Sequence, residues 1–254
     1  MILAIDIGNT NTVIGCCRDQ NILFVERLST APSRTVLEYA ISIKNVLELY
    51  KIDRDEISGA ILSSVVPPLT NLFCDAVQKI IGIRPMVVGP GVKTGLNILM
   101  DNPAQVGSDL IVNAVAAIAE HPAPLIIIDM GTATTLSVID STKNYIGGMI
   151  LPGIRVSLDS LVSRTSQLVR ISLEAPKRLI GKNTAECMKS GIIHGNAACI
   201  DGMIDRIEQE IGEKTTIIAT GGLAARITPH CTHEILLDDA LLLKGLMYIY
   251  YKNA

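Results

Sequence analysis

The sequence has few aromatic residues and no excess of positive charge. Its 254 residues include no tryptophan and two phenylalanines, and the formal net charge is −3. Proteins that bind nucleic acids commonly present a basic surface and aromatic side chains on which bases stack. We therefore expect no nucleic-acid partner. Any anionic ligand must be held by backbone N–H groups, hydroxyls and individual cations.

Long apolar runs and paired cysteines are also missing. Asp6 interrupts the first apolar stretch, no basic region precedes it, and no run approaches the ~20 residues that span a bilayer. The six cysteines show no C-x-x-C spacing, which favours reduced, mostly buried thiols. His230 and His233 flank Cys231, but no second cluster completes a zinc site. These absences predict a cytoplasmic protein with no membrane partner and no zinc.

One short pattern occurs twice. Residues 6–12 (D-I-G-N-T-N-T) follow the apolar run 2–5, and residues 129–135 (D-M-G-T-A-T-T) follow the apolar run 125–128. Each copy is followed by residues typical of a second strand. A carboxylate at a strand end, a glycine and short hydroxyl and amide donors form a cradle for phosphate and metal. The alternative is a pair of ordinary tight hairpins, but two copies at equivalent places favour the phosphate site.

Hydrophobic periodicity predicts the same succession of elements in both halves. In the first half we expect strands at about 2–7, 12–17, 21–28, 59–65 and 86–88, a helix over 36–49 capped by Ser33, and a helix over 69–80. In the second we expect strands at about 125–130, 134–140, 144–151, 216–219 and 234–237, and helices over 154–163, 183–211 and from 239. This order indicates an α/β fold with mixed sheets. The predicted molecule is two-lobed, with lobes 1–118 and 119–254 around a central cleft.

The segment between the halves, residues 101–109, is an unusual polar cluster ahead of an apolar helical stripe. Asp109 therefore stands near a helix N-terminus, where the macrodipole stabilises its charged form. The other interpretation makes Ser108 or Asp109 a simple N-cap, with Pro103 opening a preceding turn. From residue type and position alone, capping is favoured.

The ordered motifs resemble those of the type III pantothenate kinases, in the superfamily of acetate kinase, sugar kinases, actin and the heat-shock chaperone ATPases. The resemblance covers essentially the whole chain and rests on segments 6–10, 101–109, 129–134, 147–153, 181–184, 190–192 and 220–224. It implies a duplicated ribonuclease-H-like fold of the actin and sugar-kinase type. It also implies ATP-dependent phosphorylation of pantothenate to 4'-phosphopantothenate, the first step of coenzyme A biosynthesis, by a homodimer.

The resemblance also implies roles for individual residues. Asp109 would be the general base, Asp6 would act through Mg²⁺, and Asp129 would coordinate a monovalent cation, K⁺ or NH₄⁺. The other ATP contacts would come from Ile7, Gly8, Asn9, Thr10, Asn11, Thr12, Val13, Thr132, Gly221 and Gly222. The pantothenate pocket, completed at the dimer interface, would contain Met100, Gly107, Ser108, Asp109, Leu110 and Thr184.

Two positions in that pocket depart from the family pattern. Leu110 stands where the family's Gly-Ala-Asp-Arg motif has arginine, and Met100 stands where a tyrosine is usual. A lost charge-assisted hydrogen bond typically costs roughly 1.5–3 kcal/mol. Three interpretations stay open. Another basic residue, such as Arg155, Arg164 or Lys182, replaces the charge; the pocket accepts a different hydroxylated compound; or the chain binds nucleotide as a non-catalytic regulatory or accessory factor.

Overall fold

The computed structural model describes residues 1–19 and 21–254 and divides into two compact units. The first contains Met1–Leu96, Asn102–Ala119 and Ala240–Ala254, and the second contains Asn97–Asp101 and Glu120–Asp239. One passage between the units, at Ala119, lies beside the boundary expected at residue 118. The predicted division placed the whole C-terminal part in the second lobe. In the structure the C-terminal segment belongs to the first unit, because helix α7 (Leu241–Asn253) contributes to that unit's core.

The first unit is built on a mixed sheet with strand order β3-β2-β1-β4-β5. β1 runs antiparallel to β2, which runs antiparallel to β3, whereas β1, β4 and β5 are parallel. The strands are β1 (Ile2–Ile7), β2 (Asn11–Arg18), β3 (Asn21–Ser29), β4 (Gly59–Ser64) and β5 (Met86–Val87). Besides α7, the helical elements are α1 (Val36–Leu49), η1 (Arg54–Glu56), α2 (Pro67–Ile81), η2 (Pro103–Gln105) and α3 (Ser108–Glu120).

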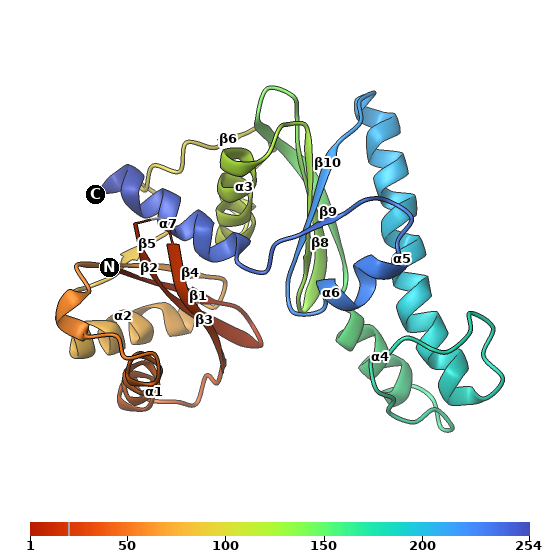
Figure 1. Ribbon diagram of the computed structural model, residues 1–254, viewed down its shortest axis with the longest axis horizontal. Helices are drawn as coiled ribbons and strands as arrows, with labels where there is room; N and C mark the ends of the chain where they lie inside the picture. The colour runs from red at the N-terminus through yellow and green to blue at the C-terminus, as the bar shows by residue number, and fades with distance from the viewer. Residues whose placement is uncertain (20) are drawn as a thin grey trace. The chain divides into compact units, whose positions relative to one another are not determined.

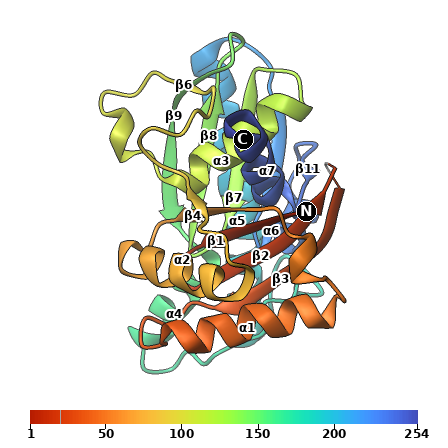
Figure 2. The same ribbon diagram turned by 90° about the vertical axis from the view of Figure 1, so that its left-hand side faces the viewer.

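Both faces of this sheet are covered, as Figures 1 and 2 show. Alternate residues of a strand point to opposite faces. Leu3, Ile5 and Ile7 pack with side chains of α1 and α2. Ile2 and Ala4 pack on the other face with residues of α7 and with Val112 of α3. By the same alternation, Asp6 belongs to the face that carries α3 and α7.

The N-cap of helix α1 lies two residues beyond the predicted cap. Its N-cap is Thr35, whose Oγ1 accepts a hydrogen bond from the N–H of Glu38. The Glu38 carboxylate accepts one in return from the N–H of Thr35, at 2.7 Å. The expectation that Ser33 caps this helix was wrong, because Thr35 has a glutamate three residues later and completes a capping box.

The second unit contains a sheet with strand order β11-β10-β7-β8-β9-β6. Its strands are β6 (Asn97–Ile98), β7 (Leu125–Met130), β8 (Ala133–Ile139), β9 (Asn144–Pro152), β10 (Thr216–Thr220) and β11 (Leu236–Leu237). Its helical elements are α4 (Ile154–Ser163), α5 (Thr184–Ile211), α6 (Ala224–Ile227) and η3 (Thr228–His230). Apart from the short edge strand β6, which was not predicted, strands β7 to β11 repeat the order and directions of β1 to β5. The predicted duplication is confirmed.

The register of the two hairpins corrects the alignment of the repeated pattern. Ile7 pairs with Thr12 across β1 and β2, and Met130 pairs with Thr134 across β7 and β8. The second turn is one residue shorter, so the structural counterpart of Thr12 is Thr134. Matching the letters D-x-G-x-x-x-T had instead equated Thr12 with Thr135.

One hydrophobic core of the second unit lies on the face of its sheet that carries α4, α5 and α6. Ile126, Ile128 and Met130 of β7 pack there with buried side chains of α4, α5 and α6. Asp129 alternates with these residues and belongs to the opposite face. Among residues 1–19 and 21–254, no helix is long and apolar enough to cross a membrane.

Candidate active site

The first hairpin brings a buried carboxylate to the base of an exposed polar turn. Asp6 is buried at the end of β1, and Asn9, Thr10 and Asn11 are exposed at the tip. The N–H of Gly8 donates to the carbonyl oxygen of Asn11 at 3.1 Å. A Cβ atom on Gly8 would stand 2.9 Å from that oxygen, so the turn admits only glycine without a shift.

Two residues of the predicted ATP segment have buried side chains turned away from Asp6. Ile7 lies in the α1/α2 core. Thr12 is also fully buried, and its Oγ1 lies 3.0 Å from Oγ1 of Thr30, which donates to the carbonyl oxygen of Gly8 at 2.8 Å. Val13 is half-buried opposite Asp6. Ile7 therefore offers a ligand only its backbone, and Thr12 acts mainly by holding the turn.

The second hairpin places Asp129 at the position that Asp6 has in the first. Asp6 pairs with Ser63 of β4, and Asp129 pairs with Thr220 of β10, the equivalent strand. Thr132 is exposed at the tip, and its carbonyl oxygen accepts the N–H of Gly153 at 3.1 Å. A Cβ atom on Gly153 would overlap that oxygen, so glycine is required where the chain closes on the tip.

Gly221 and Gly222 follow β10 directly, and Gly221 lies beside Asp129. Gly221 has φ +95°, and a Cβ atom there would stand 2.7 Å from Oδ1 of Asp129 and 2.6 Å from the N atom of Met130. The fold thus brings Asp129 and Gly221 together within the second unit. A glycine turn beside a carboxylate at a strand end has no side chain in the way, so a ligand can approach the backbone closely.

Oxygen donors beside Asp129 fit a cation. Thr135 pairs with Asp129 across β7 and β8, so the two side chains share a face of the sheet. Oγ1 of Thr135 is buried without a hydrogen-bond partner among residues 1–19 and 21–254. Carboxylate and hydroxyl oxygens are ligands of hard cations.

Asp109 stands in the first turn of α3, in the first unit. The carbonyl oxygen of Gly107 accepts the N–H of Ile111 at 3.1 Å, so Gly107 occupies the N-cap position. Oδ1 of Asp109 accepts the N–H of Leu110 at 2.9 Å. A Cβ atom on Gly107 would overlap this carboxylate oxygen, so glycine lets the carboxylate lie back over the helix start.

The electrostatics of Asp109 differ from the expectation. Burial raises the pKa of its carboxyl group, and this effect outweighs the hydrogen bonds from the N–H groups of Leu110 and Asp109, which lower it. The macrodipole argument from the sequence predicts the opposite, a stabilised charged form. The raised pKa makes Asp109 a stronger base than a solvated aspartate.

Ser108 does not cap α3. Its Oγ donates to the carbonyl oxygen of Ser64 at 3.1 Å and accepts from Oγ of Ser63 at 2.9 Å. Ser63 is fully buried and was missed as a site residue. The signal was present in the sequence, because two serines end the apolar run of β4 just before the prolines that begin α2.

No described contact joins the side chains of the remaining predicted substrate residues, Leu110, Met100 and Thr184, to the carboxylate of Asp109. Leu110 is half-buried in α3. Met100 follows β6, and its Sδ would be 3.7 Å from a Cβ atom on Gly147 of β9. Thr184 is exposed at the first position of α5, after the N-cap Asn183, whose Oδ1 accepts the N–H of Glu186.

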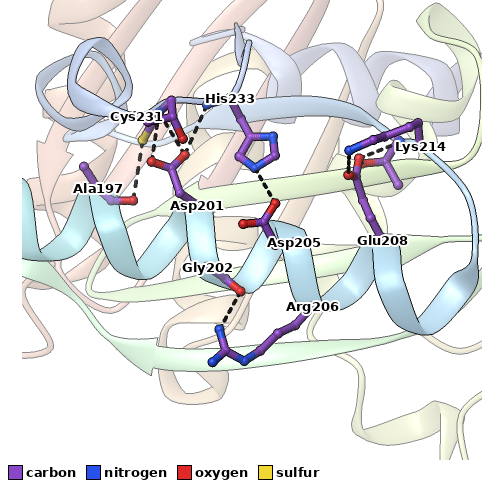
Figure 3. A network of polar contacts seen from close by, with 11 residues as sticks. Ala197, Asp201, Gly202, Asp205, Arg206, Glu208, Lys214, Cys231 and His233 are labelled. Carbon is purple, nitrogen blue, oxygen red and sulfur yellow. Dashed lines mark hydrogen bonds and ion pairs between the residues drawn. The ribbon is translucent and has the colours of Figure 1, made fainter.

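Residues 231–233 form a network of polar contacts with α5 (Figure 3). The carboxylate of Asp201 accepts the N–H groups of Thr232 and His233, and Nε2 of His233 lies 3.0 Å from Oδ1 of Asp205. In the part of the chain that the structure describes, no group of three or more His, Cys, Asp or Glu side chains is placed to hold a metal ion. These contacts fasten residues 232–233 to α5.

Comparison with known proteins gives one consistent family. The family model described as type III pantothenate kinase matches residues 2–206. A type III pantothenate kinase of Exiguobacterium sp. is 46% identical over 253 residues, covering 100% of this chain and 99% of its own. One from Halalkalibacterium halodurans is 43% identical over 253 residues, covering 100% of each chain.

Solved structures share the fold at low identity. The Acidaminococcus fermentans (R)-2-hydroxyglutaryl-CoA dehydratase component A has a TM-score of 0.57 at 16% identity, covering 99% of this chain and 97% of its own. A Sinorhizobium meliloti protein described as a 2-dehydro-3-deoxygalactonokinase has a TM-score of 0.56 at 10% identity, covering 100% and 97%. The fold is of the actin and sugar-kinase type, as predicted.

Proposed function

The chain belongs to the type III pantothenate kinase family, and we propose from this premise that it transfers the terminal phosphate of ATP to a hydroxyl of pantothenate. This reaction is the first step of coenzyme A biosynthesis. The observation that carries the proposal is the placement of Asp109 at the start of α3, where Ser108 joins that helix to the strand beside Asp6.

The two hairpin tips supply the phosphate contacts. Backbone N–H groups and the exposed side chains of Asn9, Thr10 and Asn11 hold the phosphates in the first unit, and Thr132 donates to a phosphate in the second. Gly221 and Gly222 lie against the adenosine. Asp6 would hold Mg²⁺, and the ion would supply neutralisation of the charge on the phosphates.

Asp109 acts on the acceptor. Its carboxylate orients the hydroxyl of pantothenate and receives the hydroxyl proton as the new bond to phosphorus forms. Phosphoryl transfer depends mostly on positioning and charge neutralisation, and a positioned base contributes roughly 10²–10⁴-fold. The burial that raises the pKa of Asp109 also strengthens it as a base.

Asp129 holds the monovalent cation, K⁺ or NH₄⁺. The hydroxyl of Thr135, on the same face of the sheet and without a partner in the described chain, would supply a second oxygen ligand. A cation there offsets the repulsion between the Asp129 carboxylate and the phosphates.

The acceptor pocket is the part in which this chain departs from the family pattern. The family pattern has an arginine at the position of Leu110. An exposed cation, Arg155, Arg164 or Lys182, takes its place and binds the pantothenate carboxylate. The apolar side chains of Leu110 and Met100 favour a second candidate function, in which the same phosphate site serves another hydroxylated compound. An accessory factor that binds nucleotide without turnover is the third reading. The homodimer, with Thr184 in a pocket completed by the partner, and the cytoplasmic location stay predictions.

The test is an assay of the purified chain with ATP, Mg²⁺, K⁺ and pantothenate, with the product weighed by mass spectrometry. We expect 4'-phosphopantothenate from the wild type and its loss in Asp109→Asn. Nucleotide binding without product at high enzyme concentration would defeat the kinase proposal, and a co-purifying protein would then favour the accessory factor. Leu110→Arg should lower the KM for pantothenate if pantothenate is the acceptor.

A further inference from the structure

A short hydroxyl chain links the base helix to the sheet of the first unit. Ser63 donates to Ser108 over 2.9 Å, and Ser108 donates to the carbonyl oxygen of Ser64 over 3.1 Å. Ser63 has no exposed surface, and it pairs with Asp6 in the parallel register of β1 and β4. These hydrogen bonds therefore connect β4, the strand that flanks Asp6, to Ser108, the residue that precedes Asp109.

The hydroxyl of Ser108 is used inside the protein. A serine at a helix start usually accepts a backbone N–H of the first turn. Here its single proton goes to Ser64, and one lone pair accepts from Ser63.

We propose that Ser63 and Ser108 are positioning residues that hold the first turn of α3, and with it the Asp109 carboxylate, in a fixed place beside the Asp6 strand. The inference rests on the proposed function, in which Asp109 receives the acceptor proton. It also changes the predicted role of Ser108, which acts through Asp109 and does not donate to pantothenate.

The expected size of the effect follows from catalytic geometry. A reacting group displaced by about 1 Å can cost on the order of 10²-fold in rate. Ser108→Ala removes the only side chain that joins α3 to Ser63 by a described hydrogen bond. The turn that carries Asp109 then loses its hydroxyl link to β4, while the hairpin tip that contacts ATP is unchanged.

The experiment compares Ser63→Ala, Ser108→Ala, the double variant and Ser108→Thr, which keeps the hydroxyl. We expect each alanine variant to lower kcat about tenfold with the KM for ATP unchanged within about twofold. The double variant should be no slower than the slower single variant, because both remove one interaction. Ser108→Thr should recover most of the rate.

Ser137→Ala is the matched control. Ser137 is buried in β8 of the second unit, and its Oγ lies 3.2 Å from the Tyr145 hydroxyl, so this variant also loses a buried hydroxyl pair. It should leave kcat unchanged. If the rate falls equally in Ser137→Ala and Ser108→Ala, or if Ser63→Ala and Ser108→Ala are strictly additive, the inference is wrong.

A second readout does not require turnover. NMR titration of the Asp109 side-chain carboxyl should show a lower pKa in Ser108→Ala than in wild type, because a released turn admits water around the carboxylate. Ser137→Ala should titrate like wild type. An unchanged Asp109 titration in Ser108→Ala overturns the inference even if the wild-type chain makes no phosphopantothenate, a result that would defeat only the proposed function.

Discussion

Thr12 and Thr134 occupy the same register position in the two sheets, but only Thr12 has a hydroxyl partner. In the first unit that partner is Thr30, whose N–H also donates to the carbonyl oxygen of Thr10. In the second unit the equivalent bond to Thr132 comes from Gly153, which has no side chain. Oγ1 of Thr134 is consequently buried with no partner in the described chain. The tighter closure of the second tip costs one buried hydrogen bond.

Opposite changes in stability should follow from the same substitution at these two threonines. Valine keeps the β-branched shape and removes the hydroxyl. Thr134→Val should raise the free energy of unfolding by about 1 kcal/mol, because a buried unpaired hydroxyl is lost. Thr12→Val should lower it by about 1 kcal/mol. Urea denaturation of both variants checks this, and a loss of stability in Thr134→Val would contradict it.

Replacing Asp109 should stabilise the protein while it abolishes turnover. The folded-state pKa of Asp109 is raised by burial, so ionisation penalises the native state, and stability falls as pH rises from the ordinary aspartate range through the raised value. Asp109→Asn removes that penalty at neutral pH. Denaturation at pH 7 should show a more stable variant, and the difference should shrink toward about pH 4. Equal stability at pH 7 would argue against a carboxylate whose ionisation is penalised by burial.

A methyl group at Gly221 should disturb the Asp129 site. Gly221→Ala combines a φ of +95° with overlap against Met130 and Asp129. Gly212 provides the control, because it has φ +74° at the end of α5 but no atom within 4 Å of a Cβ position. Gly212→Ala should cost about 1 kcal/mol of unfolding free energy through strain alone. Gly221→Ala should cost more and also weaken ATP binding, measured by calorimetry.

Acid sensitivity is expected from Glu208 near the end of α5. Burial raises the pKa of its carboxyl, but hydrogen bonds from Lys214 and from the N–H and hydroxyl of Thr215 outweigh burial and leave the pKa lowered. The stability that the ionised Glu208 contributes is therefore present above the ordinary glutamate pKa. It is lost as pH falls through the folded-state pKa. Figure 3 shows the contact with Lys214.

Glu208→Gln should lower the free energy of unfolding at pH 7 by about 1.5–3 kcal/mol, the usual worth of hydrogen bonds to a buried charge. The difference in unfolding free energy between Glu208→Gln and wild type should become smaller at acidic pH. Lys214 is 85% exposed, so Lys214→Met should change stability by less than about 1 kcal/mol. Thermal unfolding at several pH values checks both, and a pH-independent loss in Glu208→Gln would contradict the explanation.

Local signals in the sequence were sufficient for most elements. The limits of β1, β7 and α4 match the expected ranges 2–7, 125–130 and 154–163. Each has a continuous apolar run or a helical apolar period with a clear break at its end. The short strand β6 has no such pattern, because Asn97–Ile98 is a strand only through its pairing with β9.

The candidate site divides in the same way. The duplicated carboxylate hairpins, the glycine turn after β10 and the position of Asp109 at a helix start were all predicted from residue types and spacing. The Ser63–Ser108 link, the unequal threonines and the raised pKa of Asp109 were not. Each depends on which atoms the packed chain brings within hydrogen-bond range.

By itself, the sequence determined the α/β class, the internal duplication and the family, because apolar period, turn residues and ordered motifs are properties of neighbours along the chain. Only the tertiary structure decided the register of the second hairpin, the return of α7 to the first unit and the surroundings of Asp109. Burial and hydrogen bonding between distant segments decide these features, and neither can be read from residues that stand next to one another.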